Sequence, residues 1–212
     1  EVDALEYKDG KIQGLETKKG HFDTDLVVTT QQLPDLVHIL PDQLLNIKKS
    51  YSTIHYLANV CLVLFLNRSL SQFYWTNVQD PDVPFVGIIE QTQWTGNEAY
   101  NGWHIVYLSS YLTRDDKRYH MNKNQLFRYY LPYIQKLFPD FTPQYVEQLY
   151  VWRAKYAQPI VHTGYRHHIP HIQSPVENLL ISTMAQIYPN DRQVSNGVEQ
   201  AWQTLEVIKS KL

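Results

Sequence analysis

The residues best suited to ligand chemistry lie near the C-terminus, where the run SNGVEQAWQTLEVIKSKL begins at Ser195. Apolar residues recur at helical spacing through this run, so the sequence predicts a helix with Ser195 or Asn196 as its N-cap. The first turn of such a helix offers free backbone N–H groups and the positive end of the helix dipole to an electron-rich ligand atom. Gly197, which has no Cβ atom, would let that ligand come close. One face of the helix is expected to pack against the protein, namely Val194, Val198, Ala201, Trp202, Leu205, Ile208 and Leu212.

A second group that could do chemistry is a set of four histidines in the irregular segment 158–175. His168 and His171 have a spacing that a metal ion could use on a turn, but no Cys and no H-E-x-x-H pattern accompanies them. The alternative is that they are polar surface or line a cavity, where they could titrate near neutral pH. The four residues are His162, His167, His168 and His171.

The elements that must position the C-terminal residues are a buried strand at 179–184 and a connection closed by Tyr188, Pro189 and Asn190. Together the run LLISTMAQIYPNDRQVSNGVEQA resembles the closing FAD motif of the superfamily of flavin-dependent amine oxidases, phytoene desaturases and protoporphyrinogen oxidases. The resemblance implies that backbone N–H groups near Val194 and Ser195 meet the flavin, and that Asp191 lies near the ribityl chain. The sequence departs from the family at Gln193, where a glycine is usual, and at Asn196, where a second small residue is common. The cofactor contacts so implied are Asp191, Arg192, Val194, Ser195 and Gly197. The alternative reading of this run is an ordinary amphipathic C-terminal helix.

The first part of the chain reads as a meander of short strands, with a hairpin turn at Asp9 and Gly10. A continuous apolar run after Asp25 then predicts a strand covered on both faces, as in a parallel sheet. Two short helices joined at Pro41 follow in residues 31–47. This order resembles the middle of the same family's dinucleotide-binding domain, so we expect residues 25–30 and 179–182 to share one sheet.

The middle of the chain has the pattern of apolar runs and turns that is typical of an antiparallel sheet. Apolar runs at 54–66, 73–78, 85–91 and 103–109 predict strands, and a further strand is predicted at 144–156. An amphipathic helix at 122–138, bent at Pro132, is expected to cover one face. The runs ANVCLVLFLNRSLSQFYW, PFVGIIEQTQW and VWRAKYAQPI resemble the substrate half of bacterial FAD-dependent oxidoreductases near the mutase that acts on UDP-galactopyranose.

The predicted fold class is therefore α+β, with an antiparallel β-rich substrate domain and a partial Rossmann-like FAD-binding portion formed by both chain ends. The expected parts are 1–48 (meander, return strand and short helices), 49–174 (substrate-binding domain) and 175–212 (closing strand and helix). A full family member opens with a G-x-G-x-x-G turn, but the 8 glycines of this chain nowhere have that spacing. We therefore expect the chain to be the C-terminal portion of a longer protein. The isolated portion would bind FAD poorly or not at all, and an exposed sheet edge and apolar surface would be covered by the missing N-terminal half or by another copy of the chain.

Composition limits the other possibilities. A net charge of −2 with scattered basic residues does not favour nucleic acid as a partner. The one cysteine, Cys61, excludes an intrachain disulfide. There is no signal-peptide pattern and no apolar run of about 20 residues, so we expect a cytoplasmic protein with no integral membrane segment.

The resemblance also implies where a small organic substrate would lie. Arg153, Tyr156 and Gln158 would approach the flavin face, and Tyr165 could line the same cavity. Because the flavin itself transfers the hydride, no protein base is obligatory. The amine oxidase branch carries a lysine on the strand at 58–66, and no lysine occurs in that run, which counts against amine oxidation.

Two alternatives to an FAD-dependent oxidoreductase remain open. A non-redox flavoenzyme of the UDP-sugar mutase type would need cationic and phenolic groups for a diphosphate, for which Arg153, Arg166, Tyr150 and Tyr156 are available. A non-catalytic binding or assembly module would work without flavin, and the missing glycine-rich turn favours that reading for the chain as it stands.

Overall fold

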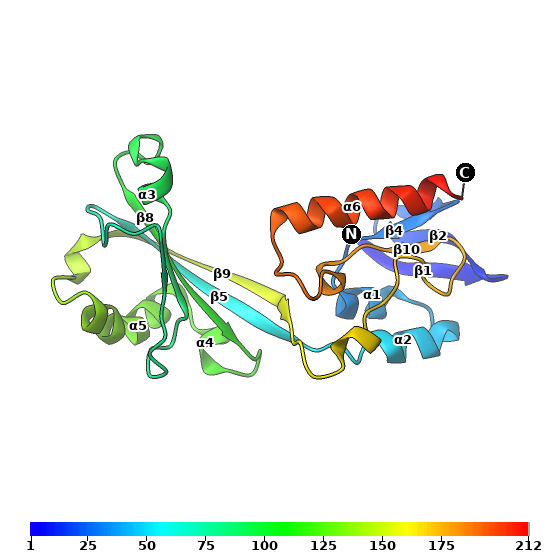
Figure 1. Ribbon diagram of the computed structural model, residues 1–212, viewed down its shortest axis with the longest axis horizontal. Helices are drawn as coiled ribbons and strands as arrows, with labels where there is room; N and C mark the ends of the chain where they lie inside the picture. Colours follow the sequence, from blue (N-terminus) through cyan, green and yellow to red (C-terminus); the bar gives the residue numbers. More distant parts are fainter. Residues whose placement is uncertain (212) are drawn as a thin grey trace. The chain divides into compact units, whose positions relative to one another are not determined.

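The computed structural model describes residues 1–211 and shows two compact units. The first unit combines both chain ends, Glu1–His55 and Pro159–Leu212, and the second is the continuous segment Tyr56–Gln158 (Figure 1). The chain leaves and re-enters the first unit at neighbouring points, since the Ile160 N–H donates to the His55 carbonyl oxygen at 2.8 Å. Residues 49–55 and 159–174, expected with the substrate-binding part, lie with the chain ends in this division. The assignment of cofactor and substrate roles to the parts stays a prediction.

A three-stranded antiparallel meander opens the first unit. It comprises β1 (Val2–Lys8), β2 (Lys11–Thr17) and β3 (Gly20–Asp23). Asp9 and Gly10 join β1 to β2 with positive φ angles of 51° and 85°, the backbone that a D-G hairpin turn requires. The predicted hairpin is confirmed.

The two chain ends meet in a parallel pair of strands. β4 (Val27–Thr29) lies beside β10 (Leu179–Ile181), with Val27 opposite Leu179. The expectation that the two ends share one sheet is confirmed. The expectation that β4 is covered on both faces is wrong, because Val28 is 40% exposed. Within residues 1–211, β4 has a strand neighbour on one edge only.

The buried side chain of Asn178, directly before β10, ties the meander to this pair. Its Oδ1 accepts from the Ile12 N–H at 2.7 Å, and its Nδ2 donates to the carbonyl oxygens of Ile12 at 2.7 Å and Asp25 at 3.1 Å. The amide thereby satisfies backbone groups that would otherwise be buried without partners.

Short helices follow β4, as the spacing around the prolines predicts. These are α1 (Leu33–Ile39), η1 (Asp42–Leu44) and α2 (Leu45–Tyr51). Pro34 stands in the first turn of α1, where its missing N–H costs nothing. The face that they bury carries Leu33, Leu36, Leu40, Leu44 and Tyr51.

The C-terminal helix α6 (Val194–Lys209) differs from the sequence prediction in two ways. Its N-cap is Gln193, which makes no side-chain cap hydrogen bond, so neither Ser195 nor Asn196 caps it. The buried residues of the helix are Gln200 and Thr204. Their side chains bond to the preceding segment: Gln200 Nε2 donates to Gln186 Oε1 at 3.0 Å and Thr204 Oγ1 donates to Ser182 Oγ at 3.1 Å.

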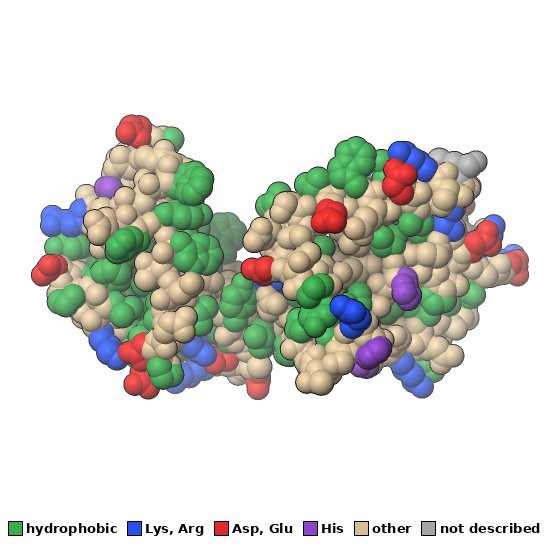
Figure 2. Space-filling model, viewed as in Figure 1, with side chains coloured by type: hydrophobic (Ala, Val, Ile, Leu, Met, Phe, Trp, Pro, Cys, Tyr) green, Lys and Arg blue, Asp and Glu red, His purple; other side chains and the backbone are tan. Residues whose placement is uncertain are grey.

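Much of the predicted apolar face of α6 is consequently exposed, which corrects the expectation that it packs. Val194 is 86% exposed, Val198 53% and Trp202 61%. Figure 2 shows green hydrophobic side chains along the surface that α6 occupies in Figure 1. We call Val194, Val198, Ala201 and Trp202 the α6 stripe. Leu212 lies outside the described residues.

The second unit is built on a five-stranded antiparallel sheet in the order β6-β7-β8-β5-β9. The predicted sheet and its class are confirmed, and β8 pairs with β5 along the whole length of β8, from Ala58 opposite Leu112 to Leu66 opposite His104. The strands are β5 (Tyr56–Leu66), β6 (Trp75–Asn77), β7 (Gly87–Glu90), β8 (His104–Leu112) and β9 (Val146–Pro159).

One face of this sheet is covered by α5 (Lys123–Leu137). The helix starts with a capping box, in which Asn122 Oδ1 accepts from the Gln125 N–H and the Gln125 side chain accepts from the Asn122 N–H. It continues through Pro132 as one helix. Its buried residues Leu126, Tyr130 and Ile134 join alternate residues of β5 and β8 in the core.

The remaining elements are short, and none of the helices described is long and apolar enough to cross a bilayer. They are α3 (Thr92–Thr95), η2 (Glu98–Tyr100), α4 (Lys117–His120), η3 (Pro143–Tyr145), η4 (Tyr165–His167) and η5 (Met184–Gln186).

Candidate functional site

The predicted cofactor contacts lie on one continuous segment of the first unit, the turn before α6 and the first turn of the helix. Asp191 and Ser195 are exposed, and Arg192 is half-buried. The Asp191 carboxylate accepts from the Arg192 N–H at 2.8 Å, which holds the turn. A hollow of about 180 Å³ beside this segment is lined by Gln186, Ile187, Tyr188, Asn190, Asn196, Glu199, Gln200 and Gln203.

The start of α6 has the chemistry expected of an anion or carbonyl site. The first intrahelical hydrogen bond runs from the Gly197 N–H to the Gln193 carbonyl oxygen at 3.2 Å, and no side chain of the N-cap residue occupies the earlier amides. These first-turn N–H groups lie at the positive end of a 16-residue helix. A Cβ on Gly197 would make ordinary contact with Met184 Sδ at 3.7 Å, and the expected approach of a ligand to Gly197 stays a prediction.

In the second unit, the face of the sheet opposite α5 forms the other candidate site. Side chains alternate along each strand, so the residues between the core positions line this face. One row runs Val63, Tyr107, Ile89 and Trp75 across β5, β8, β7 and β6. We call the surface formed by these rows the second face of the sheet.

The adjacent row of the second face consists of small and polar residues. It runs Cys61, Ser109, Gly87 and Asn77. Nothing lies within 4 Å of the position that a Cβ on Gly87 would take, so this row has open space above its centre. Burial raises the pKa of Cys61 to about 11, which keeps it a thiol and excludes it as a nucleophile near neutral pH.

A chain of neutral hydrogen bonds borders the second face. The Tyr107 hydroxyl donates to Gln91 Oε1 at 2.6 Å, and Gln91 Nε2 donates to the Tyr100 hydroxyl at 2.7 Å. Burial is the main cause that raises the pKa of Tyr107, so its phenol stays neutral. The Gln91 amide therefore fixes both hydroxyl groups in one orientation.

Aromatic rings enlarge this surface. The Phe65 ring lies 5.6 Å from that of Trp103 and 5.3 Å from that of Tyr150, measured between centroids. Trp75 at one edge of the sheet is 55% exposed, and Trp152 on the opposite edge strand is 67% exposed. Exposed indoles and phenols in this number favour binding of a ring-containing ligand.

The residues that the sequence predicted for substrate binding divide between the two units, and their role stays a prediction. Arg153 donates from its guanidinium to the carbonyl oxygens of Tyr119 and Met121, and these bonds hold its side chain against the second unit. The Tyr156 ring lies 5.6 Å from that of Tyr56. Gln158 is half-buried at the end of β9.

Tyr165 belongs to the first unit and is buried there. Its hydroxyl donates to the Ala185 carbonyl oxygen at 2.9 Å, and burial raises its pKa to about 12. The ring packs 5.5 Å from Tyr188, in the connection that leads to α6. Its predicted place in a substrate cavity stays a prediction, while its contacts here support that connection.

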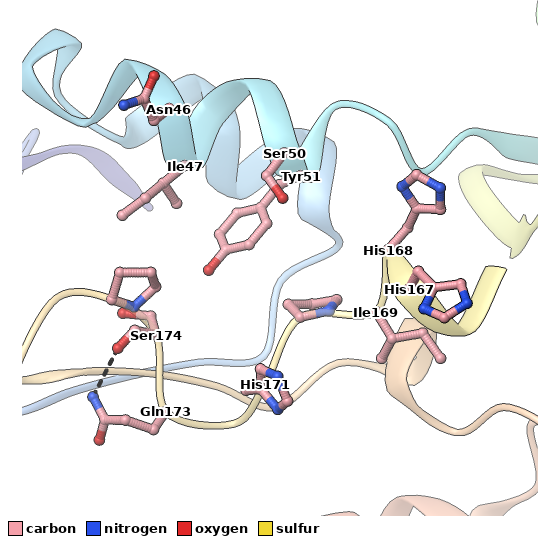
Figure 3. Close-up of a pocket in the computed structure, with 12 residues that line it drawn as sticks. Asn46, Ile47, Ser50, Tyr51, His167, His168, Ile169, His171, Gln173 and Ser174 are labelled. Atoms are coloured by element: carbon pink, nitrogen blue, oxygen red, sulfur yellow. Dashed lines mark hydrogen bonds between the residues drawn. The ribbon is translucent and has the colours of Figure 1, made fainter. Parts of the chain in front are cut away.

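Three of the four histidines, His167, His168 and His171, line a cleft in the first unit, between α2 and residues 167–175. The cavity has a volume of about 550 Å³ (Figure 3). Figure 3 shows Tyr51 pointing from α2 toward the segment that carries Ser174, with His167 and His168 at one end. The His168 Nδ1 lies 3.3 Å from Thr53 Oγ1, and the His162 and His168 rings are 5.3 Å apart. Within residues 1–211, these histidines belong to no group of three metal-ligating side chains whose ligand atoms lie within 4.8 Å of one another, whereas Glu6, Glu16 and His21 form one.

Sequence reasoning missed the second face and the amide of Asn178. Both depend on which strands are neighbours, and that is not visible along the chain. The one signal for the second face was the excess of aromatic residues, with 16 Tyr and 5 Trp.

No protein-family profile and no curated protein matches the sequence. Solved structures do match. A candidate protoporphyrinogen oxidase from Exiguobacterium sp. aligns with 100% of this chain and 46% of its own, at 15% identity and a TM-score of 0.76. Reduced UDP-galactopyranose mutase aligns with 79% of this chain and 36% of its own, at 11% identity and a TM-score of 0.60. A glycerol-3-phosphate dehydrogenase from Bacillus halodurans, complexed with FAD, aligns with 100% of this chain and 38% of its own, at 15% identity and a TM-score of 0.58.

The chain thus has the fold of a portion of each of these solved structures. It spans less than half the length of these matching structures. The activity of a whole protein of this kind is therefore a matter for proposal.

Proposed function

We propose that this chain is the C-terminal part of an FAD-dependent oxidoreductase, in which it helps to hold the cofactor and presents an organic substrate to it. When bound, the flavin would supply hydride transfer. The observation that carries the proposal is the parallel pairing of β4 with β10, because it brings both chain ends into one layer that leads directly into α6. The matching structure complexed with FAD has the same fold over the full length of this chain.

The residues that would hold the cofactor are those at the start of α6. The backbone N–H groups of Val194 and Ser195 are the donors for an electron-rich edge of the flavin, and the helix dipole adds to their attraction. Asp191 and Arg192 lie in the turn that sets the angle of entry into the helix. These first-turn donors fit the group, because no side chain of the N-cap residue competes for them.

The second face of the sheet is the surface that we assign to the substrate. Its rows carry apolar, aromatic and neutral polar side chains, with Asn59 donating to Ser109 at 2.8 Å. A ring-containing molecule of low charge suits such a surface better than a diphosphate does. Arg153, a cation expected for a diphosphate, already donates to the carbonyl oxygens of Tyr119 and Met121. We therefore favour an oxidoreductase over a flavoenzyme of the UDP-sugar mutase type as the proposed function.

The open edge of β4 and the α6 stripe are where the remainder of the cofactor layer would dock. A strand edge offers unpaired N–H and C=O groups, and the stripe offers apolar area. Without that remainder, a second copy of the chain would compete for the same surface.

The test uses the parent protein, that is, this chain together with the residues that precede it in its gene. After gel filtration, the folded parent should show a flavin absorption spectrum, and a colourless folded parent would refute the proposal. Val194→Pro then removes one first-turn N–H from α6. Proline is accepted at the first helical position, and Gln193 before it has the extended backbone that proline favours, with φ −103° and ψ 162°.

Val194→Ala is the matched control, since it trims the side chain and keeps the N–H group. Loss of one hydrogen bond should weaken FAD binding roughly 3- to 10-fold in Val194→Pro and not in Val194→Ala. Equal affinities in the two variants would show that the start of α6 does not contact the cofactor.

A further inference from the structure

A histidine surrounded by carboxylates stands on the exposed face of the meander, away from the proposed cofactor segment. His21 Nδ1 lies 2.8 Å from Glu16 Oε1 and 3.8 Å from Glu6 Oε2. His21 Nε2 lies 3.1 Å from Asp23 Oδ1. The ligand atoms of Glu6, Glu16 and His21 all lie within 4.8 Å of one another.

The register of the three strands explains this grouping. Glu16 on β2 lies directly opposite His21 on β3, while Gly14 lies opposite both Asp23 on β3 and Glu6 on β1. Residues two apart on a strand share a face, so all five lie on the same side of the meander.

Gly14 leaves room for the His21 imidazole, because it has no side chain. A Cβ on Gly14 would lie only 2.4 Å from His21 Cε1 and 2.6 Å from His21 Nε2. The ring therefore lies over the backbone at Gly14, in space that any other residue would fill. This fixes the ring against the strand although its surroundings are exposed.

The two ring nitrogens of His21 have different partners. The Asp23 carboxylate can accept the Nε2 proton, and Nδ1 shares its own proton with Glu16 at 2.8 Å, so a cation that displaces this second proton would meet the Nδ1 lone pair beside the oxygens of Glu16 and Glu6. A histidine whose second nitrogen donates to a carboxylate is the usual arrangement of a metal ligand, because the hydrogen bond sets the tautomer and the ring orientation.

Charge favours a cation at the same position. Within residues 1–211, the ion pairs of Glu6, Glu16 and Asp23 all go to His21. One imidazolium cannot balance three carboxylates, although its hydrogen bonds, to Glu16 first and then to Asp23, raise the pKa of His21. A divalent cation that displaces the imidazole proton would reduce this excess of negative charge.

We propose that Glu6, Glu16 and His21 Nδ1 form a zinc-binding site on the meander, with Asp23 as the positioning residue. One nitrogen and two carboxylate oxygens are ligands that Zn²⁺ accepts, and three protein ligands leave a fourth position for water. Because the side chains are exposed, small rotations bring their atoms to the roughly 2.0–2.2 Å that zinc requires. The site is independent of the flavin proposal, since none of its residues lies in the β4–β10 layer or in α6.

The experiment is calorimetric titration of Zn²⁺ into the full chain after removal of bound metal by a chelator. We expect one saturable site. His21→Gln should abolish it, and Asp23→Asn should weaken zinc binding roughly 10- to 100-fold, since it keeps all three ligands and changes only the partner of Nε2. The matched control is His38→Gln, which removes another exposed histidine of the same unit.

Circular dichroism spectra that are alike for the variants and the parent chain would establish that all are folded. Absence of saturable zinc binding would overturn the proposal. So would binding that is unchanged in His21→Gln, or binding that is lost equally in His38→Gln, and His21 would then be an ion-pair partner of the carboxylates alone.

Discussion

Replacing Asn178 by alanine should destabilise the first unit by about 3–5 kcal/mol. The side chain makes three hydrogen bonds to backbone groups of Ile12 and Asp25. Each such bond contributes about 1 kcal/mol net, which gives about 3 kcal/mol. Ile12 is only 1% exposed, so its N–H would be left buried without a partner, and this adds roughly 1–2 kcal/mol.

Two measurements check the prediction. Urea unfolding followed by circular dichroism gives the free energy of unfolding, and hydrogen exchange followed by mass spectrometry gives the protection of the Ile12 amide. We expect the Ile12 amide to lose its protection in Asn178→Ala, while amides of β5 and β8 in the second unit keep theirs, because those strands pair only within that unit.

The matched control is Asn46→Ala in α2, where the asparagine is exposed and belongs to the same unit. Its effect should stay within about 0.5 kcal/mol. If Asn178→Ala costs no more than this control and Ile12 stays protected, the account of Asn178 as the link between meander and parallel pair is refuted.

Three further predictions concern single residues. Burial raises the pKa of Cys61 from 9.0 to about 11, so the neutral thiol contributes stability that is complete below pH 9 and is lost as the pH rises toward 11. A thiol reagent at pH 8 should therefore label Cys61 far more slowly in the folded chain than in urea. Equal labelling rates would contradict the burial. The carboxylate of Glu90, which is 1% exposed, accepts from the N–H groups of Leu70 and Ser71. Glu90→Ala should therefore lower the free energy of unfolding, measured by thermal or urea unfolding, by about 3–5 kcal/mol. A loss below about 1 kcal/mol would contradict the role of Glu90 in holding these N–H groups. Trp202→Glu should reduce self-association of the chain in analytical ultracentrifugation and leave its stability within about 0.5 kcal/mol, because Trp202 is 61% exposed; unchanged association would exclude the α6 stripe as the contact surface.

Local patterns predicted the elements well because their causes are local. The D-G pair predicts the first hairpin through the positive φ angles that it tolerates, and apolar spacing predicts α5 and its cover of the sheet. The parallel pairing of β4 with β10 came from the family resemblance, and the structure confirms it.

The errors concern what covers a surface. Apolar spacing in residues 194–208 shows that α6 has an apolar face, but it cannot show whether residues 1–211 supply a partner for that face. Val28 in β4 is exposed for the same reason. The N-cap was also misplaced, because Ser195 and Asn196 are good capping residues while Gln193, which takes the position, is not one.

The candidate sites were predicted unevenly. The proposed cofactor segment 191–197 is contiguous, so a single motif was enough to predict it. The second face takes residues from separate strands, such as Cys61, Gly87 and Ser109, and their grouping depends on register. The cluster at His21 escaped notice because Glu6, Glu16 and Asp23 are ordinary surface residues until three strands are aligned.

The hydrogen bonds between Asn178 and Ile12 join positions 166 residues apart, and this has a consequence for biosynthesis. While the ribosome makes the chain, the meander emerges before the segment Tyr56–Gln158, but Asn178 and the strand that pairs with β4 emerge only after that segment. The segment Tyr56–Gln158 contains its own sheet and can fold in the interval. Loop closure over such a distance adds little to the equilibrium free energy of folding, about 0.6 kcal/mol for each doubling of loop length. Its main effect is therefore to slow folding of the first unit. Within residues 1–211, the segment Glu1–His55 should therefore wait longest for its partners during synthesis and depend most on chaperones.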